Sequence, residues 1–180
     1  GRISAGNART SFISDGTVLA VDLKGGYLTV KSSKPAASLT ERLRKFNEKS
    51  DELGREYNTG LEAIVDSTGL SDQQKDSLME EFYDSFSEKY RNYNFEVLNE
   101  NKDNAISVYA LRNVYSDMSD DTLELVYASI DTAVTARNRF ASSLLKGISA
   151  RKATAEGMHF ADFSVTQPDG SEARLSDYVG

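Results

Sequence analysis

The chain of 180 residues has no cysteine, no tryptophan, one histidine and two prolines. The lack of cysteine excludes disulfides, thiolate metal sites and thiol catalysis within these residues. A single histidine disfavours a histidine-based metal site or catalytic triad. Long hydrophobic runs are also missing, because no stretch approaches the ~18 apolar residues of a membrane-spanning helix. The sequence therefore predicts no transmembrane segment in this chain, no cofactor, and no residue that is catalytic or ligates a metal.

Positive charge is scarce as well. The chain has 21 Lys and Arg against 28 Asp and Glu, a formal net charge of −7. Binding to nucleic acid needs clustered cations that replace counterions, so this balance disfavours a nucleic-acid partner. Hydrophobic residues make up 39% of the chain and charged residues 27%, which is enough apolar material to bury a core. The length fits one domain, or one domain with parts of others.

The first 34 residues predict short strands over 9–13, 17–23 and 27–30. The turn signals Ser14-Asp15-Gly16 and Lys24-Gly25-Gly26 separate them. A three-stranded meander is marginal alone unless something covers its apolar face. Two interpretations stay open: the helices that follow pack on the meander, or it is the tail of a larger sheet. We favour the second, in which residues 1–34 end an N-terminal β-rich domain.

No proline interrupts the chain between positions 35 and 168, and helical patterns begin just after the first of them. A capping box at Ser38-x-x-Glu41 starts a first helix that stops near Gly69, and a second at Ser71-x-x-Gln74 starts the next. Both helices are long, and a short turn makes them antiparallel. Three shorter helices follow, over about 105–115, from 119 onward and over about 133–154.

The predicted fold is therefore mainly α. A five-helix body over residues 38–155, made of a long antiparallel helical hairpin and three shorter helices, is flanked by an incomplete N-terminal β-meander and a C-terminal β-hairpin. That last hairpin is expected over residues 157–180. Phe163 and Val165 alternate with polar neighbours, and Pro168-Asp169-Gly170 supplies the turn. Leu175 resumes the apolar pattern on the far side.

The terminal stretch also resembles a known family. Its Gly157, Phe160-x-Asp162-Phe163, Asp169-Gly170 and Leu175-Ser176-Asp177-Tyr178-x-Gly180 are similar to the first hairpin of thioredoxin-like proteins, in the TlpA-like and alkyl hydroperoxide reductase C/thiol-specific antioxidant branch. In that family the next strand leads into a Cys-x-x-Cys motif. The resemblance implies that residues 157–180 open a thioredoxin-like domain whose catalytic part is missing from this chain. Members from Bacteroidetes carry a β-rich domain and a helical segment before that domain, which is the order predicted here.

The function that the resemblance implies is thiol–disulfide exchange by the whole protein, in the periplasm or outer cell envelope, as a secreted or lipid-anchored protein. The 180 residues would be a non-catalytic accessory region that positions the missing thioredoxin-like domain, binds protein partners or forms a homodimer. The alternative is a stand-alone acidic helical binding or scaffold protein. A third interpretation, a hydrolase built on carboxylates, needs two of them facing each other across a pocket.

Two groups of side chains on the second predicted helix and beyond could form sites. An aromatic row could line a groove for a peptide or small apolar ligand, although phenylalanines four residues apart more simply face a core. This row is Phe82, Tyr83, Phe86, Tyr90, Tyr93 and Phe95. The carboxylates are better explained as a solvated acidic surface; they include Glu80, Glu81, Asp84, Glu96, Glu100, Asp120 and Asp121.

The remaining candidates are cations and the residues near the terminal hairpin. Basic side chains on the last helix could dock an acidic partner, or simply complement the helix dipole; they are Arg137, Arg139, Lys146, Arg151 and Lys152. Glu41 and Lys45 predict an i,i+4 helix pair. His159 could titrate near neutral pH, although a surface position explains it more simply. Asp162 and Phe163 are expected to fix the hairpin rather than to react.

Overall fold

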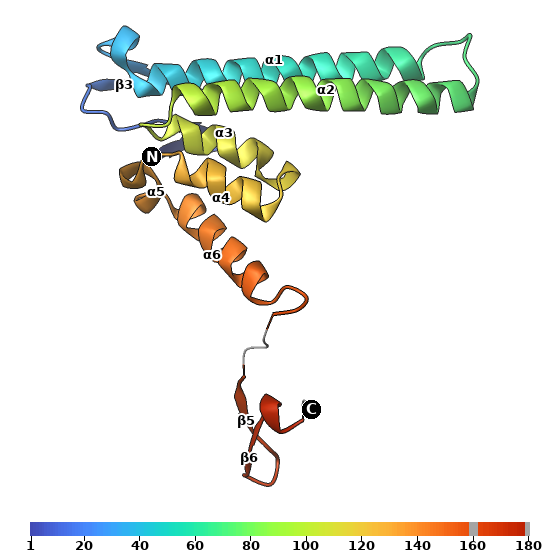
Figure 1. Ribbon diagram of the computed structural model, residues 1–180. Helices are drawn as coiled ribbons and strands as arrows, with labels where there is room; N and C mark the ends of the chain where they lie inside the picture. The colour runs from blue at the N-terminus through green and yellow to red at the C-terminus, as the bar shows by residue number, and fades with distance from the viewer. Residues whose placement is uncertain (159–161, 179–180) are drawn as a thin grey trace. The chain divides into compact units, whose positions relative to one another are not determined.

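The structure is a computed structural model that describes residues 1–158 and 162–178 (Figure 1). Six α-helices and three two-stranded antiparallel sheets lie within these residues, so the mainly-α prediction is confirmed. The chain forms two compact units, residues 1–117 and 118–180. These units do not coincide with the ranges 1–34, 38–155 and 157–180 expected from the sequence, and that domain assignment stays a prediction. The predictions on His159, Phe160, Ala161, Val179 and Gly180 fall outside the described residues.

Two separate hairpins, rather than the expected meander, form the N-terminal β part. Strand β1 (Arg2–Ala5) pairs with β2 (Ala8–Ser11), and β3 (Leu19–Lys24) pairs with β4 (Tyr27–Ser32). The first hairpin turns at Gly6. This residue has a φ of 59°, a backbone conformation that glycine adopts at low energetic cost. Its strands are short and weakly apolar, which is why the sequence pattern did not reveal β1. Strand β2 lies beside β4 without a shared ladder of hydrogen bonds.

The sequence predicts that Ser14-Asp15-Gly16 forms the turn of a hairpin. The segment is instead a loop that contacts the start of the first long helix. Asp15 accepts hydrogen bonds from the Thr17 backbone amide and hydroxyl, and from the Leu39 amide. Thr40 then exchanges two hydrogen bonds with the backbone of Ile13, at 3.1 and 2.9 Å. These contacts join the β-hairpins to the start of the first long helix.

The two longest helices are α1 (Leu39–Val65) and α2 (Asp72–Glu100), which pack along one another in unit 1. The 3₁₀-helix η1 (Pro35–Ala37) precedes them. The capping box at Ser71 and Gln74 is confirmed. The expected box at Ser38 is wrong: the Ser38 hydroxyl accepts from the Thr40 amide, and Glu41 instead pairs with Arg44 at 2.7 Å rather than with Lys45.

Helix α3 (Ile106–Val114) packs against α2 and ends in the 3₁₀-helix η2 (Tyr115–Asp117). The core of unit 1 gathers where α1, α2 and α3 meet. Its fully buried large side chains are Leu43, Leu53, Leu98, Ile106, Leu111 and Val114. This places the core at the base of the α1–α2 hairpin, close to α3 in Figure 1.

The described part of unit 2 contains three α-helices where two were expected. Helix α4 (Asp120–Ala128) follows its N-cap Ser119, and the expected helix over 133–154 is divided into α5 (Thr132–Ala136) and α6 (Arg139–Ala153). The division falls at Asn138, whose side-chain oxygen accepts from the amides of Phe140 and Ala141. Asparagine is unfavourable inside a helix and favourable as an N-cap. The capping bonds of Asn138 therefore outweigh the apolar pattern that continues past it.

A C-terminal β-hairpin is observed, but its far strand ends at Arg174, so the expectation that Leu175 continues that strand is wrong. Strand β5 (Ser164–Thr166) pairs with β6 (Glu172–Arg174) in an antiparallel register that places Val165 opposite Ala173. Gly170 has a φ of 86° in the intervening turn, and the Asp169 carboxylate accepts from the Ser171 amide and hydroxyl. The 3₁₀-helix η3 (Leu175–Asp177) follows. None of the helices in the described ranges is both long enough and apolar enough to span a bilayer.

Candidate functional site

The aromatic row of α2 meets α1 through one aromatic cluster. Tyr57 of α1 lies between two rings of α2, stacked on Phe82 at a centroid distance of 5.8 Å and tilted against Phe86 at 5.0 Å. Phe82 and Phe86 lie 6.1 Å apart. Separations of this size belong to the favourable range for aromatic pairs. The cluster therefore holds the two helices together beyond the last fully buried residue of α1, Leu53.

Two glycines of α1 shape the surface beside this cluster. The Phe82 ring occupies the space next to Gly60, where an added Cβ would lie 2.2 Å from a ring carbon. Around Gly54 nothing lies within 4 Å of that position. The free space there belongs to an open groove of about 400 Å³. Its lining is aromatic and small: Ser50, Gly54, Tyr57, Tyr83, Phe86, Ser87 and Tyr90.

The aromatic row thus divides into residues that pack and residues that face solvent. Phe82, Phe86 and Tyr90 are half-buried, whereas Tyr83 is 57% exposed. Farther along α2, Tyr93 stacks on Phe46 at 5.9 Å and donates a hydrogen bond to the Phe46 carbonyl. Burial raises the pKa of the Tyr93 phenol. The residues that pack are half-buried rather than buried, so the core interpretation holds only in part, and the groove interpretation has a physical counterpart in Tyr83, Phe86 and Tyr90.

A second cleft lies at the base of the same helices. Its volume is about 300 Å³, and it is lined by Arg42, Lys45, Phe46, Lys49, Tyr93, Val97, Glu100, Asn101 and Ile106. Arg42 donates to the side-chain oxygen of Asn101 at 2.5 Å, and Lys49 pairs with Glu52 at 2.9 Å. Cations beside an apolar wall could accommodate an anionic group, but two of the three already have partners.

Asparagines build the junction between α2 and α3. The side-chain oxygen of buried Asn101 accepts from Arg42 and Asn104, and its amide donates to the Val97 carbonyl. Asn94, also buried, accepts from Asn113 of α3 at 2.9 Å. These bonds satisfy polar groups that burial would otherwise penalise. The sequence pattern showed here only an interruption of helical periodicity.

The carboxylates show no arrangement typical of a hydrolase. A general acid needs a raised pKa, yet every described carboxyl whose pKa departs from its usual value has it lowered by hydrogen-bond donors: Asp15, Glu41, Glu52, Asp120, Asp162 and Asp169. Within residues 1–158 and 162–178, no group of three His, Cys, Asp or Glu side chains could hold a metal ion.

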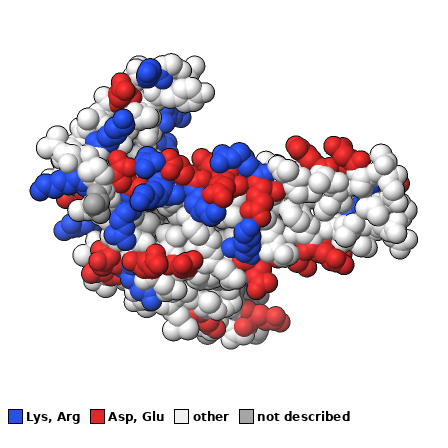
Figure 2. Space-filling view, turned by 90° about the horizontal axis from the view of Figure 1, so that it is seen from above, with Lys and Arg blue, Asp and Glu red and all other residues white. Residues whose placement is uncertain are grey.

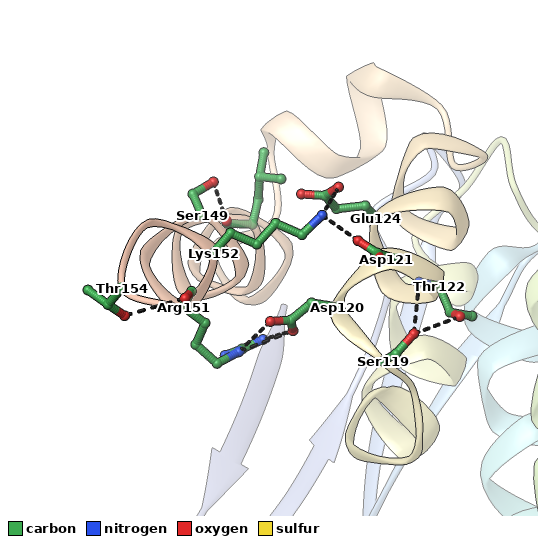
Figure 3. Close-up of polar contacts among 10 residues, drawn as sticks. Ser119, Asp120, Asp121, Thr122, Glu124, Ser149, Arg151, Lys152 and Thr154 are labelled. Carbon is green, nitrogen blue, oxygen red and sulfur yellow. Dashed lines mark hydrogen bonds and ion pairs between the residues drawn. The ribbon is translucent and has the colours of Figure 1, made fainter. Parts of the chain in front are cut away.

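The basic residues of α6 are partly engaged within unit 2 (Figure 3). Arg151 binds the Asp120 carboxylate at 2.5 Å, and Lys152 reaches both Asp121 and Glu124 at 2.7 Å. These hydrogen bonds raise the pKa of Arg151 and Lys152 and lower that of Asp120. The pairs join α6 to the first turn of α4. Arg139 and Lys146 of α6 are exposed, as is Arg137, which was expected on the same helix but is the C-cap of α5.

The residues of the terminal motif bind one another. The Asp162 carboxylate accepts from the Ser176 amide at 2.9 Å and the Ser176 hydroxyl at 2.8 Å, which lowers the pKa of Asp162. The Phe163 carbonyl accepts from the Leu175 amide. Asp162 therefore fixes the two sides of the hairpin to each other. Three apolar or aromatic side chains stay open to solvent, with Phe163 57%, Val165 50% and Tyr178 72% exposed, whereas Ala173, opposite Val165, is buried.

No protein-family model, curated protein or solved structure matches this chain. The functional interpretation therefore depends on the surfaces described above: the aromatic groove beside Gly54, the cleft at Arg42, and the apolar side of the terminal hairpin.

Proposed function

We propose that residues 1–180 are a non-catalytic accessory region of a thiol–disulfide oxidoreductase of the bacterial envelope, with residues 157–180 as the opening hairpin of its thioredoxin-like domain. The single observation that carries the proposal is the exposed apolar side of this hairpin. Val165 of β5, and Phe163 just before that strand, are at least half exposed, and β5 and β6 have only three residues each. A two-stranded sheet of this size is marginally stable without further strands or a covering helix.

Further strands paired with this hairpin would form a larger sheet in which these side chains are covered. In the resembling family that sheet belongs to the thioredoxin-like domain, whose paired cysteines exchange electrons with a substrate disulfide through a mixed disulfide. Residues 1–158 would position that domain or select its partners, and location in the periplasm or outer envelope belongs to the same proposal. The absence of cysteine from the chain assigns all thiol chemistry to that domain.

The natural reading frame after the codon of Gly180 tests the proposal directly. A strand followed by Trp-Cys-x-x-Cys supports it, and a stop codon refutes it. In an insulin-reduction assay, residues 1–180 should be inactive and the protein extended through the Cys-x-x-Cys motif should be active. As a control, replacing both motif cysteines with serine should abolish the activity of the extended protein.

A second candidate function is favoured by the aromatic groove. An acidic helical binding protein would need a concave apolar surface outside its core, and the groove beside Gly54 is such a surface. The two functions are compatible, because an accessory region can also bind a partner.

A further inference from the structure

The outer half of the α1–α2 hairpin carries apolar side chains that no other described helix of unit 1 covers. We call residues 54–90 the arm. The buried residues of α1 end at Leu53, and those of α2 begin at Asn94, so none lies within the arm. Its apolar residues are at best half-buried, and Val65, Leu78 and Tyr83 are 54%, 38% and 57% exposed. In Figure 1, α3 lies against the base of the hairpin and leaves the arm projecting.

The arm has a concave feature. The groove beside Gly54 opens between the rings of Tyr57, Tyr83, Phe86 and Tyr90, with a volume of about 400 Å³. A space of this size accepts one or two large side chains. Aromatic faces also attract cations, through the negative potential of the ring. The groove is thus suited to an apolar anchor flanked by Lys or Arg.

The charge of the chain is concentrated on the arm. Residues 54–90 hold nine Asp and Glu against three Lys and Arg, a net charge of −6, whereas the other 143 residues hold 19 against 18. Figure 2 shows the turn end of the α1–α2 hairpin, on the right, with Asp and Glu along its edges and little Lys or Arg. One of the three cations is already neutralised, because Lys89 pairs with Glu56.

We propose that the arm is a docking surface for a basic amphipathic segment of another protein, with an apolar residue in the groove and Lys or Arg over the acidic edges. Charge decides the occupant. A second copy of the arm would bring −6 against −6, which opposes a homodimer through this surface. A basic amphipathic helix matches both features, since such helices place apolar residues at i, i+3, i+4 and i+7 in a groove. This proposal depends on the arm alone, whether or not the terminal hairpin opens a thioredoxin-like domain.

The binding test uses three synthetic peptides of about 18 residues, or five helical turns. One has a leucine face and a lysine face, the second has the same pattern with glutamate in place of lysine, and the third has the leucine–lysine composition in a scrambled order. Titration calorimetry on residues 1–180 should detect the first peptide and neither of the others. Binding should weaken as sodium chloride is raised, because screening acts on exposed charges.

Gly54 offers a variant that blocks the groove without harming the fold. In Gly54→Leu the new side chain enters space where nothing lies within 4 Å of the Cβ position, and leucine is the better helix former. We expect peptide binding to weaken at least about tenfold, as for loss of a central anchor pocket. The matched control is Ala63→Leu, an exposed position half a turn round α1 from Gly54. Its affinity should equal that of the wild type.

The outcomes separate the possible occupants. The proposal is overturned if the leucine–lysine peptide does not bind, if the glutamate peptide binds as tightly, or if Gly54→Leu and Ala63→Leu bind alike. It is also overturned if sedimentation equilibrium shows a dimer that Gly54→Leu dissociates, because the occupant would then be a second copy. Amide chemical shifts of the bound protein should change in residues 54–90, and changes confined to other residues would contradict the site.

Discussion

The carboxylate of Asp15 and the backbone amide of Leu39 are hydrogen-bonded at 2.7 Å. Leu39 begins α1, so its amide is one of those that a helix leaves without an internal acceptor. The other carboxylate oxygen accepts from the Thr17 hydroxyl and amide at 2.6 and 3.1 Å. These donors, the Thr17 hydroxyl above all, lower the pKa of Asp15 to about 2. The charged Asp15 thus joins the loop between the β-hairpins to the N-terminus of α1, which is the positive end of that helix.

Replacing Asp15 with asparagine should therefore lower the free energy of unfolding of unit 1 by about 1–2 kcal/mol near pH 7, the range for a lost helix cap. The folded-state pKa of about 2 lies below the ordinary value of 3.8. The stabilisation is thus fully present above about pH 4 and is lost as the pH falls toward 2. Urea unfolding of both proteins at pH 7 and at pH 2.5–3 would measure the difference, which should shrink in acid.

The control for this prediction is Asp22→Asn on β3, an exposed carboxylate of the same charge. It should change the unfolding free energy little at either pH. An equal loss in Asp22→Asn would show that net charge, rather than the bond to Leu39, is responsible.

Asn101 should be the most sensitive polar position at the α2–α3 junction. It is 4% exposed. Its side chain accepts hydrogen bonds from Arg42 and Asn104 and donates one to the Val97 carbonyl. Alanine would remove an acceptor of the Arg42 guanidinium and one of the two acceptors of the Asn104 amide, which also donates to Asp103, at a cost of about 2–3 kcal/mol. Asn99→Ala, two residues away and exposed, should be nearly neutral. Equal denaturation midpoints for the two variants would contradict a structural role for the Asn101 side chain.

Much of the helical layout could be predicted from the sequence because it depends on local signals. Ser71 and Gln74 form the capping box that their spacing predicts, and α2 starts at Asp72 as a result. The break at Asn138 was missed because apolar residues lie on both sides of it, Val134 before and Phe140 after. The period reports which face is apolar, but the capping bonds of Asn138 decide where the helix stops and restarts.

The candidate site was predictable only in part, because its shape depends on packing between helices. The aromatic row was visible in the sequence, and the core interpretation predicted a fully buried face. Gly60 instead receives the Phe82 ring while Gly54 stays open, and no residue pattern distinguishes these two glycines. The role of Asp15 was hidden for a related reason, since its partner Leu39 lies 24 residues along the chain.

Exchanging the charges of the ion pair between Asp120 and Arg151 should preserve part of its stabilising effect. Asp120→Arg places two cations together beside the positive end of α4 and should lower the melting temperature of unit 2. Adding Arg151→Asp should restore part of the loss, and the recovery should diminish at high salt because both groups face solvent. Thermal melts of the four proteins of this cycle at low and high sodium chloride would measure the coupling. If the second substitution gives no recovery at low salt, the pair does not hold α6 to α4.

The two glycines of α1 predict opposite responses to the same substitution. In Gly54→Ala the new methyl group meets nothing within 4 Å, so helix propensity alone acts and the unfolding free energy should rise by about 1 kcal/mol. In Gly60→Ala the methyl group would lie 2.2 Å from the Phe82 ring, which also stacks on Tyr57. Overpacking costs about 1–3 kcal/mol, so the net result should be a loss. Urea unfolding of the pair measures this sign difference; stabilisation of both variants would mean that the Phe82 ring moves freely and that the aromatic cluster does not fix the two helices.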